Sequence, residues 1–428
     1  MQQLTAWGIR LTYNLLFCLL LPLLLYRLHT SGSAGKGFAG RWLEHFGWVP
    51  PLQAAKSIWI HAASVGEVLA AAPLIKALKQ QRPDLTLVLT TTTRTGADQA
   101  ETLAAWATHR YAPLDCPWMV NAFVRRIKPQ ALLIIETERW LNYMLVCQRH
   151  TIPVAVVNGR LSPRSFKRYQ HFKAFFRVWS QPLARLLVQE QEDARRFKQL
   201  GIAEEKCVLT GSIKFDIEFP AHVSEQGQQL REVLGLQRPV WMAASTHQGE
   251  EQQVLQAFRQ VLTMLPHSLL ILVPRHPQRF EEVANLLAQQ GFNTVRRTAN
   301  SSVTSVTQVY LGDTMGELPM LLAAADVTFV GGSLVTVGGH NLLEPAALGK
   351  PCLTGPHYFN FSDITRQLVS SGGAKVVENA TALATAVTQL LQDPVQCQQM
   401  GEAAKAVVKR NRGALQKTLQ AIQALLPA

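Results

Sequence analysis

The segment IHAASVGEVLAAAPLIKALKQQRPD, residues 60–84, joins the end of an apolar strand to an amphipathic helix. The strand is SIWIHAAS and the helix is SVGEVLAAAPLIKALK, a pairing typical of a βα unit in a parallel sheet. Ser64 and Glu67 fit a capping box, in which the Ser side chain accepts an amide of the first turn and the Glu reaches back to the cap. Glu67 is therefore either a helix cap or a carboxylate placed for chemistry.

Apolar, β-branched runs alternate with amphipathic stretches along the chain, in two sets. The first set is SIWIH, LTLVLT, ALLIIE, IPVAVVN and RLLVQ, and the second is PVWMAAS, SLLILVP and DVTFVGG. This alternation predicts an α/β fold with two Rossmann-like domains facing a central cleft, where ligands bind. We expect an acceptor-binding N-terminal domain over residues 31–213, a Gly-, Pro- and polar-rich linker over 214–237, and a nucleotide-binding C-terminal domain over 238–428.

The charge of the chain lies in its first half. The 428 residues carry a formal charge of +13, with 47% hydrophobic and 17% charged residues. Residues 1–214 hold 27 Lys and Arg against 13 Asp and Glu, whereas residues 215–428 hold 15 against 16. Such a field favours nucleic acid, a membrane surface or a phosphorylated substrate. The six cysteines form no C-x-x-C pair, so neither a zinc site nor a disulfide framework is indicated, and a reducing cytosolic setting fits best.

The N-terminus is strongly apolar. Leu11–Leu28 reads LTYNLLFCLLLPLLLYRL, and Arg10, Arg27 and Lys36 lie within or beside it. A membrane span needs roughly 20 apolar residues, so this run predicts a marginal transmembrane helix or a monotopic anchor. The alternative is a cleaved signal peptide. We expect residues 1–30 to be a retained membrane anchor.

Three segments of the second half are typical of phosphate or nucleotide binding. VGGSLVTVGGHNLLEPAALGKP places four glycines before a predicted helix start, whose amides would approach a phosphate, with Asn341 as cap and Glu344 as a ribose ligand or a second capping group. Arg275 follows a strand in LILVPRHPQRF and would pair with phosphate, or lie on the surface. Thr314 and Glu317 repeat the capping spacing. Neither a P-loop nor a D-x-D pair is present, so no metal site is expected.

Residues 159–179, GRLSPRSFKRYQHFKAFFRVW, interleave cations with aromatic side chains. This pattern suits single-stranded nucleic acid, a membrane interface or a phosphorylated lipid. The alternative is an amphipathic core helix with a solvated basic face. Because the chain also has a predicted membrane anchor, we prefer the lipid interpretation to the nucleic-acid one.

Together the motifs resemble one family, the lipopolysaccharide Kdo transferases, which are inverting glycosyltransferases of GT-B architecture. The matching pieces, in chain order, are ASVGE, ETERWLN, NGRLSPRS, TGSIKFD, STHQGEE, PRHPQRF, GDTMGEL, VGGSLVTVGGHNLLEPA and GPHYFNF. They cover about residues 42–365. The order of these pieces is more specific than any single motif.

The resemblance implies transfer of 3-deoxy-D-manno-octulosonic acid (Kdo) from CMP-Kdo to a lipid A precursor, at the cytoplasmic side of the inner membrane. It implies that Glu67 is the general base and that Glu136 and Lys214 stabilise the transition state. It further implies that CMP is held by Pro274, Arg275, Met315, Gly316, Glu317, Asn341, Leu342, Leu343 and Glu344. No metal or other cofactor is expected, and the anionic membrane surface, but no nucleic acid, is an expected partner.

The chain departs from the family pattern at Arg139 and Leu141, where ETELWPN is usual, and at Leu342, where NPLE is usual. The charged Arg139 changes the surroundings of the two glutamates, which are themselves present. The rival within the enzymes is a GT-B transferase that uses a UDP-sugar and a lipid-linked acceptor. From another class, a membrane-anchored nucleic-acid-binding protein accounts for the charge but gives no reason for the ordered motifs.

Overall fold

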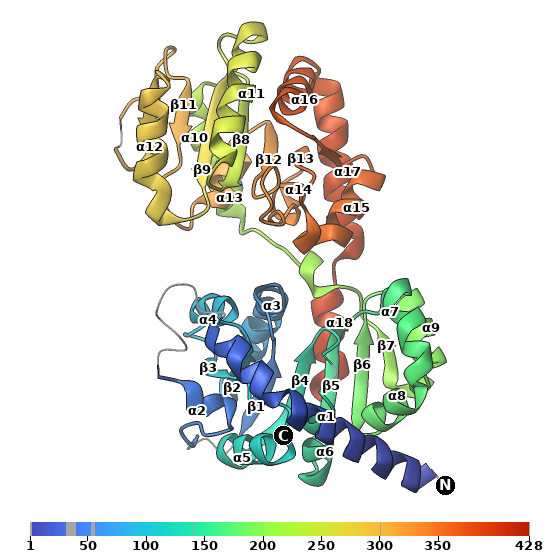
Figure 1. The fold of residues 1–428 in the computed structure, drawn as a ribbon. Helices are drawn as coiled ribbons and strands as arrows, with labels where there is room; N and C mark the ends of the chain where they lie inside the picture. The colour runs from blue at the N-terminus through green and yellow to red at the C-terminus, as the bar shows by residue number, and fades with distance from the viewer. Residues whose placement is uncertain (1, 31–39, 53–55, 139, 300, 428) are drawn as a thin grey trace. The chain divides into compact units, whose positions relative to one another are not determined.

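The computed structural model describes residues 2–30, 40–52, 56–138, 140–299 and 301–427. The chain divides into two compact units, which are described separately (Figure 1). Unit 1 is Met1–Asp216 together with Arg412–Ala428, and unit 2 is Ile217–Asn411.

Unit 1 is built on a seven-stranded parallel sheet with the order β3-β2-β1-β4-β5-β6-β7. The strands are β1 (Ser57–His61), β2 (Thr86–Thr91), β3 (Thr108–Tyr111), β4 (Pro129–Ile135), β5 (Val154–Gly159), β6 (Leu183–Val188) and β7 (Cys207–Leu209). The helices are α1 (Gln2–Thr30), α2 (Trp42–His45), α3 (Val65–Gln81), α4 (Arg94–Glu101), α5 (Pro117–Ile127), α6 (Leu141–Arg149), α7 (Pro163–Tyr169), α8 (Lys173–Ser180), α9 (Gln191–Gln199) and α18 (Ala414–Gln423).

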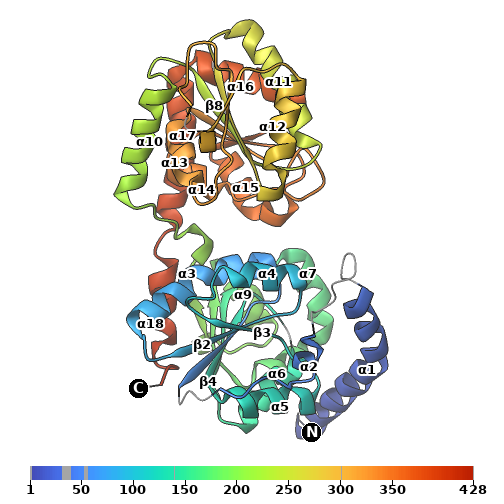
Figure 2. The ribbon, with the colours of Figure 1, turned by 90° about the vertical axis from the view of Figure 1, so that its left-hand side faces the viewer.

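The strands of unit 1 are apolar on both faces because helices cover both sides of the sheet (Figure 2). On one side Trp59 packs with Phe123 and Tyr143, at 4.9 Å between ring centroids in each case. On the other side Ile58 and Ile60 belong to the core that α3 completes. The predicted βα unit is therefore the central element of this sheet.

Helix α1 lies along unit 1 with one face turned inward. Ile9 and Tyr13 pack against the core of the unit. The Tyr13 hydroxyl donates to the buried carboxylate of Asp115 at 2.6 Å, and Asn142 donates to Asn14 at 2.9 Å. In the part of the chain that the structure describes, no helix has the length and apolar character that a membrane crossing requires.

Unit 2 repeats the architecture with the sheet order β10-β11-β9-β8-β12-β13-β14. The strands are β8 (Val240–Thr246), β9 (Leu269–Pro274), β10 (Thr294–Arg296), β11 (Val309–Leu311), β12 (Val327–Val330), β13 (Cys352–Thr354) and β14 (Ala374–Val376). The helices are α10 (Ala221–Leu234), α11 (Glu250–Met264), α12 (Phe280–Gln289), α13 (Leu318–Ala324), α14 (Leu343–Ala347), α15 (Ser362–Ser370), α16 (Ala380–Gln392) and α17 (Pro394–Asn411). All strand pairs in this sheet are parallel.

The observed division differs from the predicted domains 31–213 and 238–428 in two places. Most of the predicted linker 214–237 is helix α10, which packs on α13 so closely that a Cβ on Gly227 would meet the Cβ of Ala323 at 2.4 Å. The segment 412–428 returns to unit 1, because the apolar side of α18 joins the core of that unit (Figure 1). Asp216 fixes the return by accepting the backbone amides of Gly413 and Leu415, each at 2.6 Å.

Candidate functional site

Glu67 lies in the first turn of α3 and its carboxylate turns back toward the end of β1. One oxygen accepts the amide of Ala63 at 2.6 Å, and the other accepts the Ser64 hydroxyl at 3.3 Å. The predicted capping box is corrected in one half, because the Ser64 side chain donates to Glu67 and accepts no helix amide. The Glu carboxylate reaches back as predicted, but to the amide of Ala63.

The Glu67 carboxyl is buried, with 8% of the residue exposed. Burial is the largest cause that raises its pKa, to about 8, and the negative charges of Glu138 and Glu136 raise it further. The hydrogen bonds from Ala63 and Ser64 oppose this shift. A carboxylate with a pKa near the working pH is suited to accepting a proton in a reaction.

Glu136 and Lys214 form an ion pair with 2.7 Å between Lys Nζ and Glu Oε1. Glu136 follows β4 and has a φ of 60°, a conformation that costs a non-glycine residue about 1 kcal/mol or more and that concentrates at functional sites. Lys214 lies in a short 3-10 helix, Ile213–Phe215. The buried side chain of Asn158, also at a φ of 60°, accepts the Ile213 amide at 3.3 Å and so fixes this turn.

Sheet topology brings these groups to one edge of unit 1. The order β3-β2-β1-β4 reverses between β1 and β4, and such a switch point is where α/β sheets bind ligands. Glu67 follows β1 and Glu136 follows β4, so they flank this point from neighbouring strands. The three predicted catalytic residues therefore lie in the same unit. Arg139, the unusual residue between them in sequence, lies outside the described residues.

In unit 2, the predicted donor residues lie at the carboxyl ends of the strands. Pro274 ends β9, and the amide of Arg275 donates to the carbonyl of Thr246 at the end of β8 at 3.0 Å. Glu344 is in the first turn of α14, where burial raises the pKa of its carboxyl, while Asn341 and the charge of Arg275 oppose the shift. Leu342 and Leu343 between them are buried.

The loop Met315–Glu317 can offer a ligand its backbone groups, but the carboxylate of Glu317 is already bonded within the protein. Glu317 accepts two hydrogen bonds from Arg297, each at 2.9 Å, and one from the Thr314 hydroxyl at 2.6 Å. Met315 is 62% exposed and Gly316 has a φ of 84°, which glycine adopts without strain. Any ligand of this loop would therefore meet the backbone around Gly316 and the Met315 side chain.

The glycine-rich loop after β12 binds an internal carboxylate. Glu250, fully buried at the start of α11, accepts the amides of Gly332, Ser333 and Leu334 at 2.6 to 2.9 Å. The Leu343 amide is likewise taken, by the Asn341 side chain at 3.1 Å. The glycines predicted that these amides would bind a phosphate. That prediction is wrong for these amides, because side chains of the protein already accept their hydrogen bonds. The contact of Glu250 with this loop was not predicted, because 82 residues separate it from Gly332.

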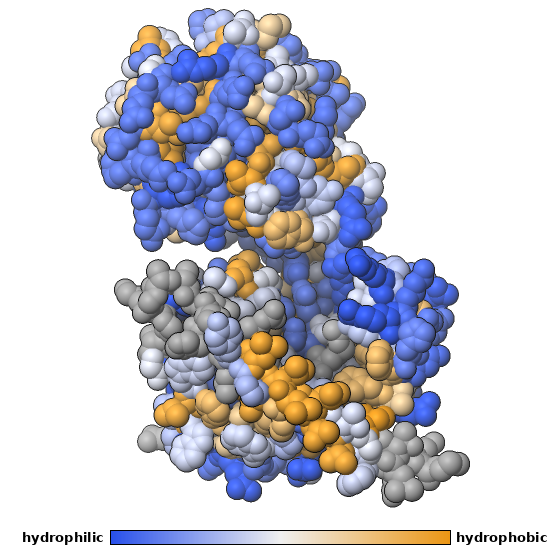
Figure 3. Space-filling model, in the orientation of Figure 1, coloured by the Kyte–Doolittle hydropathy of each residue, from blue (hydrophilic) through white to orange (hydrophobic). Residues whose placement is uncertain are grey.

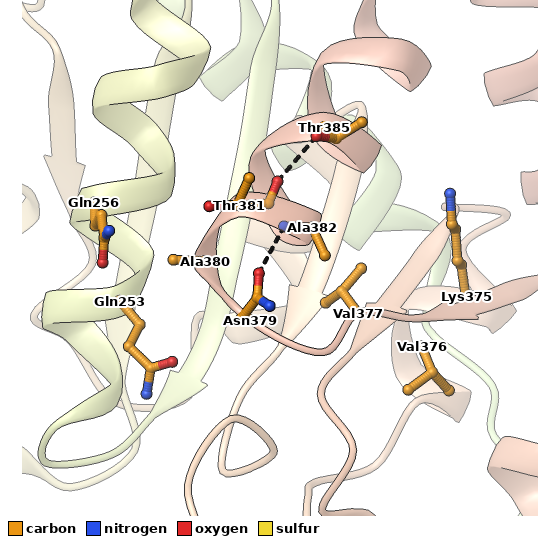
Figure 4. Close-up of a pocket in the computed structure, with 10 residues that line it drawn as sticks. All are labelled: Gln253, Gln256, Lys375, Val376, Val377, Asn379, Ala380, Thr381, Ala382 and Thr385. Atoms are coloured by element: carbon orange, nitrogen blue, oxygen red, sulfur yellow. Dashed lines mark hydrogen bonds between the residues drawn. The ribbon is translucent and has the colours of Figure 1, made fainter.

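Two cavities of unit 2 differ in their relation to these residues. One of about 630 Å³ is lined by Gly316 and Glu317 together with Arg297 and Tyr310. Another, of about 580 Å³, lies between α11 and α16, where Lys375 is its charged side chain, and contains none of the predicted site residues (Figure 4). Among the side chains described, no group of three or more His, Cys, Asp or Glu is placed to hold a metal ion.

Comparison with known proteins identifies relatives along the whole chain. Residues 40–217 match the family described as 3-Deoxy-D-manno-octulosonic-acid transferase (kdotransferase), and residues 244–407 match Glycosyl transferases group 1. A 3-deoxy-D-manno-octulosonic acid transferase of Haemophilus influenzae is 39% identical over 425 residues, covering 97% of this chain and 99% of the relative. One of Bordetella pertussis is 35% identical, covering 93% and 94%.

Among solved structures, UDP-GlcNAc 2-epimerase from Neisseria meningitidis bound to UDP-GlcNAc is similar with a TM-score of 0.53. It is 16% identical, and the match covers 86% of this chain and 100% of that one. At this identity the likeness shows the fold alone, with two parallel-sheet α/β domains of GT-B type. The two relatives, however, extend over nearly the full chain at more than a third identity. The chain therefore belongs to the 3-deoxy-D-manno-octulosonic acid transferases, which are glycosyltransferases of lipopolysaccharide biosynthesis.

Proposed function

We propose that this Kdo transferase moves Kdo from CMP-Kdo to a lipid A precursor with inversion, and that Glu67 is the general base. The observation that carries the proposal is the buried Glu67 carboxyl, whose pKa is about 8, on the strand next to the Glu136–Lys214 pair. An inverting transfer needs a base that removes the proton of the acceptor hydroxyl while the sugar bond to phosphate breaks. Glu67 has the proton affinity for this step.

Lys214 and Glu136 are assigned to the charge that develops in the transition state. The ammonium of Lys214 is held by Glu136 and oriented by the turn that Asn158 anchors, so little reorganisation is needed when charge forms. The bond between Lys214 and Glu136 keeps the cation at the end of β4, the strand next to the one that leads to Glu67.

CMP is assigned to unit 2, with Arg275 toward the phosphate and Glu344 toward the ribose. Arg275 follows β9 and its charge acts on Glu344, so the two groups are close enough to serve one nucleotide. CMP departs as a phosphate monoester anion and needs little protonation. Protein cations would therefore meet the charge of the leaving group without a metal.

The inner membrane, on its cytoplasmic side, is the proposed location, with α1 lying in the interface. Figure 3 shows apolar surface gathered along this helix. Its outward side chains are all more than half exposed: Trp7, Leu11, Leu15, Leu16, Leu19, Leu20, Leu23 and Tyr26. Exposed leucines at a spacing of four residues form a stripe suited to the acyl boundary of a bilayer. The basic charge of residues 1–214 would add attraction to anionic lipid and to the phosphates of the acceptor.

The test is incubation of purified protein with CMP-Kdo and a tetraacylated lipid A precursor, followed by mass measurement of the products. We expect a mass increase of one or more Kdo residues, and CMP to bind in preference to UDP. A product with a UDP-sugar and none with CMP-Kdo would replace this proposal with the rival GT-B activity. A mobility shift of RNA or DNA at moderate salt would favour the nucleic-acid-binding alternative.

A further inference from the structure

Three histidines meet at the carboxyl edge of the sheet in unit 2. His247 follows β8, His276 follows β9, and His340 lies in the glycine-rich loop between β12 and α14. The rings of His247 and His340 face each other edge to edge, with centroids 5.0 Å apart and 11° between their planes. The ring of His276 stands edge-on to His247 at 5.3 Å.

The two rings share a hydrogen bond, with 2.8 Å between their Nε2 atoms. One Nε2 must donate and the other must accept, so the accepting ring carries its own proton on Nδ1. A neutral pair of this kind still has one basic Nδ1, on the donating ring. Protonation there keeps the shared bond, turns it into a charge-assisted one, and leaves both Nδ1–H groups as donors.

The surroundings hold the pair neutral while favouring an anion. Burial lowers the pKa of His247 to about 4 and of His340 to about 3. Arg275 and His276 lower both values further by charge repulsion, and Arg279 lowers that of His247.

The nearby carboxylates offset only part of this positive field. Glu250 is enclosed by backbone amides. Glu251 and Glu282 are bonded to Arg279 and offset its charge, which leaves Arg275 as a source of the field. Burial raises the pKa of Glu344, which disfavours its charged form. An incoming negative charge would stabilise a proton on the histidine pair, because it opposes the repulsion from Arg275.

The scaffold around the pair is built for a fixed geometry. Glu250 accepts the amide of His247 at 3.2 Å in addition to the amides of residues 332–334, so one buried side chain ties the two histidine-bearing loops together. A Cβ on Gly332 would lie 3.0 Å from the ring of His340, so the loop fits closely around it. The sheet order reverses between β8 and β12, so the pair occupies the switch point of unit 2.

We infer that the His247–His340 pair is an anion-binding element of the donor site, which binds an anionic oxygen of the nucleotide sugar and takes up one proton from solvent as it does so. The inference rests on the proposed function and deepens it. CMP-Kdo offers two anionic groups of the same chemistry, the phosphate and the carboxylate of the sugar acid. The bond that forms is between an Nδ1–H group of the protonated pair and that oxygen.

The test is calorimetry of CMP and cytidine binding at pH 7 in buffers of different ionisation enthalpy, with the full chain and its His247→Gln and His340→Gln variants. We expect the wild type to take up close to one proton with CMP and none with cytidine. Each variant should lose the proton uptake and about ten- to a hundredfold in CMP affinity, as for a lost charged hydrogen bond. Cytidine should bind all three proteins alike. His267→Gln, at an exposed histidine of the same unit, is the matched control and should match the wild type.

Two further arms make every outcome decisive. If the variants bind CMP normally but their KM for CMP-Kdo rises tenfold or more, with proton uptake on donor binding, the anion is the sugar carboxylate. The inference would be overturned if the wild type took up no proton with either CMP or CMP-Kdo. It would also be overturned if the variants bound CMP and used CMP-Kdo as the wild type does. Imidazole ¹⁵N NMR of the wild type with and without CMP needs no variant and reports the same protonation. A wild type that binds UDP instead of CMP would contradict the proposed function itself.

Discussion

At the scale of single residues, the role of Glu67 as a base can be tested apart from its structural role at the helix start. Glu67→Gln keeps a side-chain oxygen that can accept the Ala63 amide but removes the basic carboxylate. We expect Kdo transfer to fall at least about a hundredfold, the contribution typical of a positioned base, with folding retained. Initial rates and thermal melting of the purified variant measure the two effects. Near-normal turnover in a folded variant would remove Glu67 from the mechanism.

Stability should also depend on pH through Glu67. Folding raises the pKa of this carboxyl from 4.5 to about 8, so the folded state holds the proton more tightly than the unfolded chain. The resulting stabilisation is complete below pH 4.5 and is lost as the pH rises through 8. Glu67→Gln cannot ionise and escapes this loss. We therefore expect the Tm of the variant, relative to the wild type, to rise between pH 5 and 9. A constant difference would mean that Glu67 ionises freely in the folded protein.

Glu138 should set the pH at which the base works. Its charge is the larger of the two carboxylate contributions that raise the pKa of Glu67, after burial. Since a base must be ionised, turnover of the wild type should rise with pH up to about 8. Glu138→Gln removes the repulsion and should move this rise to lower pH. Glu101→Gln, at an exposed glutamate whose charge is not among those that raise the pKa of Glu67, should leave the profile unchanged. An unshifted profile in Glu138→Gln would show that the charge of Glu138 does not set the pKa of Glu67.

At the scale of elements, the periodic patterns predicted the strands and helices that local sequence determines. They did not predict features that depend on contacts between residues far apart in the sequence. The first strand and helix were predicted because their apolar spacing is continuous, and they form β1 and α3. The assignments of Glu136 and Lys214 came from family resemblance, since no spacing rule joins residues 78 positions apart. Helix α10 lies in the predicted linker because its Gly and polar residues obscure the apolar positions Val223 and Leu230. Both are buried, and the helix packs on α13.

Helix α1 gives a prediction at this scale. Leu15 and Leu19 are 61% and 69% exposed on its outer face, so Leu15→Glu with Leu19→Glu should leave the fold intact. We expect binding to vesicles of phosphatidylethanolamine and phosphatidylglycerol to weaken at least about tenfold, because two apolar side chains no longer enter the bilayer. Leu236→Glu, at a 63% exposed leucine of unit 2, is the control. Co-sedimentation measures both, and equal binding of all proteins would place the membrane contact elsewhere.

At the scale of the whole molecule, the chain crosses between the units twice, after Asp216 and before Arg412. Unit 2 is continuous in sequence, whereas unit 1 needs α18, whose Ile422 is fully buried in its core. We therefore expect residues 217–411 alone to fold and to gain thermal stability with CMP, as we also expect of the full chain. Residues 1–411 should fold with a defective unit 1, and Ile422→Ala in the full chain should cost about 2–5 kcal/mol. Denaturant unfolding distinguishes them when it is followed by tryptophan fluorescence of the wild type and of its Trp241→Phe variant, because Trp241 is the single tryptophan of unit 2. Without α18, the core of unit 1 loses a buried helix and should lose its packing. A stable, fully active protein that ends at residue 411 would contradict this, because it would show that α18 covers unit 1 without stabilising it.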